Sequence, residues 1–111
     1  MSKEIVPSKW EIWHARFNFD KSGYKYRPVI VLDIAEDILV IMVTSVTNKL
    51  HLEHDYELQD WKQAGLTKAS IARLDRIATV PLNYIGTAGR IGKLSDRDVK
   101  SIETILSNMK A

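Results

Sequence analysis

Hydrophobic residues fall into short runs separated by polar residues, a pattern typical of β-strands rather than of long helices. An aromatic-rich segment predicts a first strand at residues 9–17, and neither of its two faces is uniformly apolar. A run of β-branched residues predicts a second strand at 26–34, and a third apolar run predicts a strand at 38–45. The first half of the chain is therefore predicted to fold mainly as β-sheet.

The second and third predicted strands are joined by the tight polar turn Ala35-Glu36-Asp37. So short a connection between two apolar runs predicts an antiparallel hairpin. In such a hairpin the end of one strand returns to the start of the other. Thr44 and Ser45 are therefore expected to lie near Arg27.

The second half of the chain gives weaker signals. Residues 51–56 predict a short edge strand, and residues 59–64 predict a brief helix that ends at Gly65. An alternating pattern predicts a strand at 69–74, and residues 75–80 either continue that strand or pair close to it. We therefore expect the sheet to continue into this half of the chain.

The C-terminal part combines turn signals with a clear helical pattern. Pro81 is expected to open a turn or a single helical turn, and the glycines within residues 84–94 predict a bent or bulged strand. Ser95 is a favourable N-cap, and apolar residues recur after it at helical spacing. These apolar positions are Val99, Ile102, Ile105, Leu106 and Met109. Several short strands followed by one packing helix predict a small, mainly antiparallel β-barrel.

Composition narrows the class of protein without identifying it. The 111 residues are 45% hydrophobic and 27% charged, which is ordinary for one globular domain spanning residues 1–111. The absence of cysteine excludes disulfides and thiolate metal sites, and no apolar run reaches membrane-spanning length. The N-terminus lacks the apolar core of a signal peptide, so we expect a cytoplasmic protein. The net charge of +2 is modest but permits a locally basic groove.

Residue spacing indicates neither a metal site nor a cofactor site. His14, His51 and His54 do not show metal-ligand spacing, and the last two fit a surface strand better than a ligand set. The glycines of residues 86–92 are not followed by a helix of the kind that binds phosphate. We therefore expect no metal and no cofactor.

Arg27-Pro28 stands at the entrance of the second predicted strand. Proline fixes its own φ and favours an extended conformation for the preceding residue, so Arg27 stands on rigid backbone. A guanidinium at this place offers a planar set of donors suited to phosphate. A salt bridge at the end of a strand is the simpler interpretation, and the residues alone leave both open.

Arg73 and Asp75 are the second notable pair. Residues two apart in a regular strand point to the same face, so a cation and a carboxylate are expected side by side. One interpretation is a salt bridge within the strand. The other is metal-free RNA cleavage, which needs a base for the ribose 2′-OH, an acid for the leaving oxygen and a cation for the charged phosphorane. Asp75 would be the base, and Arg73 or Arg27 would stabilise charge, although arginine is a poor proton donor.

Several segments, in order along the chain, resemble the MazF/PemK toxins. They are Glu11-Ile12-Trp13, Arg27-Pro28-Val29, Val43-Thr44-Ser45, the block from Asp60-Trp61 through Gly65-Leu66 to Ser70–Ile77, and Ile91–Ser95. The resemblance implies an SH3-like antiparallel β-barrel with a C-terminal helix, usually as a homodimer. It implies the toxin of a type II toxin–antitoxin pair, a metal-free, sequence-selective endoribonuclease. The implied partners are single-stranded RNA and a cognate antitoxin.

The resemblance also implies roles for individual residues. It makes Arg27 and Thr44 catalytic, and in the PemK-like branch it makes Arg73 and Asp75 an acid–base pair. The product would then be a 2′,3′-cyclic phosphate. The candidate RNA-binding residues are Glu11, Lys25, Ser45, Lys49 and Ser70.

Two features depart from the family pattern. The loop before Arg27-Pro28 carries no Glu or His where many members have a His-Glu or Ser-Glu pair, and Trp10 stands where a glycine is usual. These departures bear on loop-based recognition and so on cleavage specificity. They leave open an alternative function, a catalytically inactive SH3-like barrel that binds an antitoxin-like partner or nucleic acid as a regulator.

Overall fold

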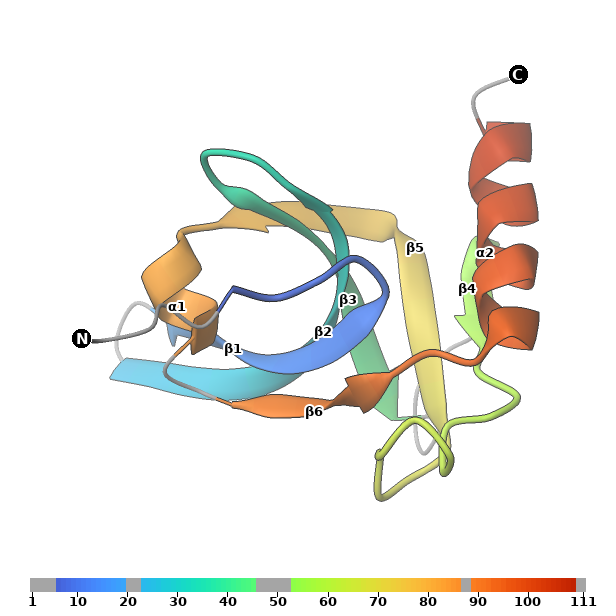
Figure 1. Cartoon of the computed structure of the whole chain (residues 1–111), viewed down its shortest axis with the longest axis horizontal. Helices are drawn as coiled ribbons and strands as arrows, with labels where there is room; N and C mark the ends of the chain where they lie inside the picture. Colours follow the sequence, from blue (N-terminus) through green and yellow to red (C-terminus); the bar gives the residue numbers. More distant parts are fainter. Residues whose placement is uncertain (1–5, 20–22, 46–52, 87–88, 110–111) are drawn as a thin grey trace.

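The protein folds as one curled β-sheet with two helices, a short one after the fifth strand and a longer one at the C-terminal end (Figure 1). The computed structural model describes residues 6–19, 23–45, 53–86 and 89–109. In chain order the elements are β1 (Glu11–Phe19), β2 (Gly23–Ile34), β3 (Ile38–Ser45), β4 (Asp55–Glu57), β5 (Ser70–Val80), α1 (Leu82–Gly86), β6 (Arg90–Lys93) and α2 (Asp96–Met109).

The six strands are arranged in the order β4-β5-β3-β2-β1-β6, and all neighbours are antiparallel. The predicted mainly β fold with a C-terminal helix and the predicted hairpin of β2 and β3 are confirmed. Within the described residues no hydrogen-bonded pairing joins the outer strands β4 and β6. The expected barrel is therefore a curled sheet that does not close.

The short internal helix lies at a different place from the one expected. Residues 59–64 form consecutive turns, with Ala64 N donating to Asp60 O at 3.0 Å and Leu66 N donating to Trp61 O at 3.0 Å. The short helix is α1, directly after Pro81, where the sequence predicted a turn or a single helical turn. The helix predicted at residues 59–64 is therefore wrong.

The two faces of the sheet bury two separate clusters of apolar side chains. One cluster packs against α2 and the turns after β4: Ile12, Ile30, Ile41, Val43, Leu58, Ala64, Ala72, Leu74, Leu94 and Ile102. The other lies on the opposite face, near α1: Trp13, Ala15, Val29, Val31, Ile38, Val40, Val80 and Ile85. Neighbouring residues of β1 and β2 alternate between the clusters, as the period of a strand requires. Burial on both faces fixes the register of the sheet.

Strand β5 is interrupted by a large bulge. Ile41 on β3 pairs with Ile77, whereas the next residue, Met42, pairs with Arg73. Residues 74–76 are therefore extra on β5 and have no counterpart on β3. Figure 1 shows β5 turning sharply along its length. A bulge bends the strand and re-aims the side chains beside it.

Two glycines let the turns after β4 lie against β6. A Cβ on Gly65 would stand 2.5 Å from Ile91 O, and a Cβ on Gly92 would stand 1.9 Å from Ala64 O. Gly65 also has a φ of +99°, which suits the end of a turn and disfavours other residues. The backbones of the two segments thus approach closer than side chains would permit.

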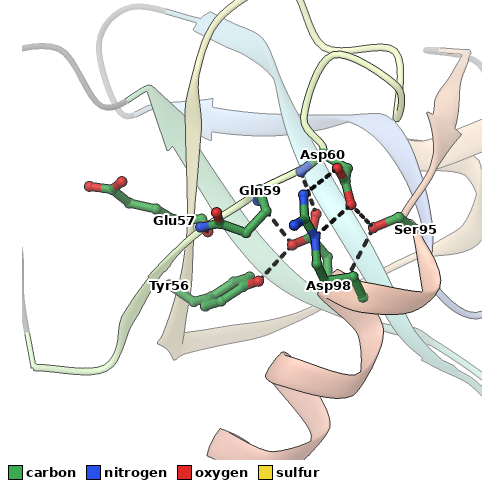
Figure 2. Close-up of polar contacts among 7 residues, drawn as sticks. Tyr56, Glu57, Gln59, Asp60, Ser95 and Asp98 are labelled. Atoms are coloured by element: carbon green, nitrogen blue, oxygen red, sulfur yellow. Dashed lines mark hydrogen bonds and ion pairs between the residues drawn. The ribbon is translucent and has the colours of Figure 1, made fainter.

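Asp98 ties the same turns to α2 (Figure 2). Its buried carboxylate accepts hydrogen bonds from Tyr56 Oη at 2.6 Å and from the backbone N–H groups of Gln59 and Asp60, both at 2.9 Å. Asp98 N in turn donates to Ser95 Oγ at 3.2 Å, which confirms Ser95 as the N-cap. A hydrogen-bonded carboxylate at the N-terminal end of α2 also suits the helix dipole.

Trp10 shows how the chain accommodates the residue that replaces the usual glycine. Its φ is +72°, a left-handed conformation that is uncommon outside glycine. The backbone is held on both sides, because Trp10 N donates to Val31 O at 2.7 Å and Leu94 N donates to Trp10 O at 3.0 Å. The ring packs at the edge of the core, with Lys9 Nζ 5.3 Å from its centroid.

Candidate functional site

The β2–β3 hairpin brings Arg27 and Thr44 together, as the short turn between these strands predicted. Val29 pairs with Met42 in this antiparallel hairpin. Two residues before Val29 and two residues after Met42, Arg27 and Thr44 therefore lie opposite each other. Arg27 is exposed, Thr44 is partly buried, and both line the same two surface hollows. The predicted proximity of Arg27, Thr44 and Ser45 is confirmed, since all three line one of these hollows.

The first hollow, here named the arginine hollow, has a volume of about 290 Å³. It is lined by Arg27, Met42, Val43, Thr44, Arg73 and Arg76. Arg73 pairs with Met42 across the β3–β5 ladder, directly before the bulge. The hairpin and the bulged strand thus bring three arginines and Thr44 to the lining of one hollow. Such an arrangement binds and stabilises a phosphate carrying developing charge.

The second hollow, the rim hollow, lies beside the end of β3 and the start of β5 and measures about 260 Å³. It shares Arg27, Val43 and Thr44 with the arginine hollow and adds Pro28, Ser45, Leu66, Thr67, Lys68 and Ser70. Ser70 Oγ donates to Lys68 O at 2.8 Å, which fixes the backbone of the loop entering β5. The rim hollow therefore joins the catalytic candidates to that loop.

A third hollow, the histidine hollow, continues from the rim hollow and measures about 450 Å³. It is lined by His14, Pro28, Gly65, Leu66, Thr67, Lys68, Arg90 and Ile91. The two hollows share Pro28, Leu66, Thr67 and Lys68. We refer to the three hollows together as the basic groove.

The basic groove carries positive charge without an opposing carboxylate in its lining. Its cationic members are Arg27, Lys68, Arg73, Arg76 and Arg90. Among the described lining residues there is no Asp or Glu. A cleft lined by one sign of charge attracts polyanions.

Two of the guanidinium groups are held by carboxylates outside the groove lining. Arg90 Nε lies 2.7 Å from Glu11 Oε2, and Arg73 Nη2 lies 3.8 Å from Asp55 Oδ2. The Asp55 side chain is fully buried, whereas that of Arg73 retains 17% exposure. The Arg90–Glu11 distance is that of a charge-assisted hydrogen bond, which restricts the guanidinium of Arg90, whereas Arg73 and Asp55 form a longer ion pair.

Glu11 makes several contacts besides its ion pair. Its Oε1 accepts hydrogen bonds from Ser8 N at 2.6 Å and Trp13 Nε1 at 3.0 Å. Burial alone would raise the pKa of Glu11, but the two hydrogen bonds and the Arg90 guanidinium outweigh burial and lower that pKa. Glu11 thus pairs with Arg90 of the groove but is not itself one of the lining residues. Its role in binding RNA stays a prediction.

The structure does not bring Asp75 beside Arg73 in the way that the sequence predicted. Residues 74–76 form the bulge, so the two-residue alternation on which the expectation rested is interrupted there. Asp75 is exposed, it forms no ion pair with Arg73 among the described residues, and Arg76 rather than Asp75 lines the arginine hollow. The role of Asp75 as base stays a prediction.

The other predicted RNA-binding residues lie partly inside and partly outside the basic groove. Ser45 and Ser70 line the rim hollow. Lys25 is exposed on β2, two residues before Arg27, and lies outside the lining of the three hollows. Lys49 lies outside the described residues, as do the whole loop 46–49 and residues 51–52 of the edge strand predicted at 51–56.

Sequence reasoning missed four basic residues of the groove: His14, Lys68, Arg76 and Arg90. Arg76 directly follows the Arg73–Asp75 pair, but only the bulge places it in the arginine hollow. The other three come from β1, the loop before β5 and β6, which meet through packing of the turns after β4 against β6. No local pattern in the sequence marks that meeting.

The described residues show neither a membrane helix nor a metal-binding cluster. None of the described helices combines the length and apolar character that crossing a bilayer requires. Within the same residues, no group of three or more His, Asp or Glu side chains is placed to hold a metal ion.

Comparison with known proteins gives a consistent result. A model of the PemK-like, MazF-like toxins of type II toxin–antitoxin systems matches residues 8–109. Among curated protein sequences, no match to this chain was found.

Solved structures similar to this chain share its fold at low sequence identity. An endoribonuclease in complex with its cognate antitoxin, from mycobacterial species, is 15% identical, with a TM-score of 0.69 and 93% of each chain covered. The Mycobacterium tuberculosis toxin MazF-mt6 is 21% identical, with a TM-score of 0.65, covering 88% of this chain and 93% of that one. A MazE–MazF structure from Deinococcus radiodurans is 14% identical, with a TM-score of 0.73 and coverage of 96% and 97%.

Proposed function

The chain belongs to the PemK-like, MazF-like toxins of type II toxin–antitoxin systems, and we propose that it is a metal-independent endoribonuclease cleaving single-stranded RNA. The observation that carries this proposal is the arginine hollow, which Arg27, Arg73 and Arg76 line together with Thr44. Phosphodiester cleavage without a metal requires positive charge around the reacting phosphate, and this hollow concentrates it.

In the proposed reaction the ribose 2′-OH attacks the adjacent phosphorus. A new O2′–P bond forms, the P–O5′ bond breaks, and the products are a 2′,3′-cyclic phosphate and a 5′-hydroxyl end. The base takes the proton of the 2′-OH, and an acid protonates the departing 5′-oxygen. Arg27 and Arg73 donate to the non-bridging oxygens as their negative charge grows, and the Thr44 hydroxyl adds a further hydrogen bond.

Asp75 is our proposed base. It is exposed on the bulge, next to Arg76, which itself lines the arginine hollow. A carboxylate accepts a proton readily, whereas an arginine releases one only with difficulty. In this proposal the RNA also contacts the bulge at residues 74–76, which carries Asp75 beside the arginine hollow.

The same groove supports a proposal about partners. A segment lined by Arg27, Lys68 and Arg73 attracts an acidic peptide as well as RNA. We therefore propose that an acidic segment of a cognate antitoxin competes with RNA for the basic groove. We also propose a cytoplasmic homodimer, for which a solution mass corresponding to two chains at micromolar concentration is the check.

One observation favours a second candidate function. The described lining of the groove holds no carboxylate, and the segment before Arg27-Pro28 carries no Glu or His. Without a carboxylate in its lining to act as base, the groove would bind RNA or an acidic partner and leave it uncut. The alternative is therefore a catalytically inactive regulator that uses the same groove.

The deciding experiment incubates the full chain with a mixed-sequence RNA in EDTA. The endoribonuclease proposal predicts discrete cleavage by the wild type and at least about a hundredfold loss of rate in Arg27→Ala, because a positioned charge stabiliser is removed. Lys100→Ala is the matched control, since Lys100 is exposed on α2 and outside the groove. RNA binding without any cleavage by the wild type would instead support the regulator.

A further inference from the structure

We propose that the histidine hollow is a second nucleotide-binding subsite, which holds a nucleotide next to the one cleaved at the arginine hollow. This inference rests on the proposed function and deepens it. His14 is the Cα partner of Pro28 and Ala15 is the Cα partner of Arg27, so His14 and Arg27 stand on opposite faces of the sheet. The rim hollow connects these faces through Arg27 and Pro28. A strand bound at the arginine hollow therefore enters the histidine hollow when it crosses the rim.

The lining of the histidine hollow has the two kinds of group that a nucleotide needs. Pro28, Leu66 and Ile91 supply apolar surface, and the exposed His14 supplies a flat ring on which a base stacks. Lys68 and Arg90 supply positive charge for a phosphate. The volume of about 450 Å³ falls within the range of about 300–1,000 Å³ found for ligand pockets.

The walls of this hollow are built by contacts that hold them in place. Glu11 fixes Arg90 through the 2.7 Å ion pair and is itself held by Ser8 and Trp13. The opposite wall is the loop that begins at Gly65, whose backbone lies against β6. Groups that are positioned before binding lose less entropy when a ligand arrives.

The chemistry favours RNA over an acidic protein segment. An acidic peptide needs only the cations, whereas this hollow combines cations with a ring and three apolar side chains. The histidine hollow is also connected to the arginine hollow through the rim hollow, which shares lining residues with both. A single strand satisfies both features at once, because its phosphates alternate with bases.

The test compares a short RNA carrying the mapped cleavage site with the same RNA extended by two nucleotides at either end. For the wild type we expect kcat/KM to rise about tenfold on extension at one end. His14→Ala and Lys68→Ala are expected to remove most of that gain. Lys62→Ala, an exposed lysine outside the groove, is the control and should keep it. Lys68→Ala should also reduce the slope of log affinity against log salt by about 0.7 for the extended RNA.

The outcomes separate the subsite from the function. Cleavage by the wild type with an unchanged gain on extension in both variants would overturn the subsite and leave the endoribonuclease standing. Neither cleavage nor binding of either RNA by the wild type would overturn both. Weaker binding of a polyglutamate peptide in the two variants, with the RNA gain unchanged, would assign the hollow to an acidic protein segment and overturn the proposal.

Discussion

Asp98 on α2 accepts a 2.6 Å hydrogen bond from the hydroxyl of Tyr56 on β4, across 42 residues of sequence. Its two oxygens also receive the N–H groups of Gln59 and Asp60, so one buried carboxylate fixes the start of the turns after β4 (Figure 2). Burial, followed by the hydrogen bond to Asp98, raises the pKa of Tyr56. These turns lead into the loop that forms one wall of the basic groove.

Replacing Asp98 should therefore destabilise the fold strongly. Asp98→Ala leaves three donors without their acceptor, and we expect the free energy of unfolding to fall by about 3 kcal/mol or more. Urea denaturation measures the change. Asp96→Ala, an exposed residue in the same first turn of α2, should cost less than about 1 kcal/mol. Equal losses in the two variants would contradict the anchoring role.

The ion pair of Glu11 with Arg90 should make stability depend on pH. Because the folded state lowers the pKa of Glu11 from its ordinary 4.5, the stabilisation is fully present above pH 4.5 and is lost as pH falls through the lowered value. The free energies of unfolding of wild type and Glu11→Gln, measured by urea denaturation, should differ by about 1–2 kcal/mol at pH 7 and become equal in strong acid. Glu103→Gln on the exposed side of α2 is the control, with a smaller difference at pH 7.

The difference in free energy of unfolding between wild type and Glu11→Gln could instead stay constant from pH 7 to pH 3. That result would show that the charge-dependent contacts of Glu11 do not cause the difference. Glutamine retains an acceptor oxygen, so the comparison isolates the charge.

Gly92 should tolerate no side chain. A Cβ there would stand 1.9 Å from Ala64 O, so Gly92→Ala must displace the turns after β4, and we expect a loss of about 3 kcal/mol or more in unfolding free energy. Gly23→Ala is the matched control, because a Cβ at Gly23 meets no atom within 4 Å and only the φ of +79° opposes it. Its expected cost is about 1–2 kcal/mol. Thermal denaturation that ranks Gly23→Ala as the more damaging change would refute the close packing.

One substitution tests the proposed role of Asp75 as the base. Asp75→Asn should lower the rate of RNA cleavage about a hundredfold while RNA affinity stays the same, because it removes a proton acceptor with little change of shape. Asp33→Asn, an exposed carboxylate elsewhere on the sheet, should leave the rate unchanged. Single-turnover kinetics with direct binding separates the two quantities. Full activity of Asp75→Asn would remove this residue from the mechanism.

Local sequence signals were sufficient where the structure is local. The turn between β2 and β3 has only three residues, so the pairing of these strands and the approach of Arg27 to Thr44 followed from it. The C-terminal helix followed from Ser95 and the helical spacing of apolar residues, and Ser95 Oγ accepts the expected capping hydrogen bond.

Features that depend on distant contacts were not predictable in this way. Residues 59–64 have helical composition, but the N–H groups of Gln59 and Asp60 donate to Asp98, almost forty positions away, and the segment forms turns. The bulge at residues 74–76 leaves no mark in the pattern of β5, so it separated Asp75 from the predicted geometry and placed Arg76 in the arginine hollow. The histidine hollow needs three segments to meet.

Removal of one hydroxyl tests the central claim most directly. An RNA carrying the cleavage site and the same oligonucleotide with 2′-deoxyribose at the scissile position are incubated with the protein in EDTA, and the products are weighed by mass spectrometry. We predict that the RNA is cut to a 2′,3′-cyclic phosphate and a 5′-hydroxyl end, while the deoxy substrate stays intact, because the 2′-OH is the attacking group. Cutting of the deoxy substrate, or cutting of RNA only after a divalent ion is restored, would contradict the mechanism.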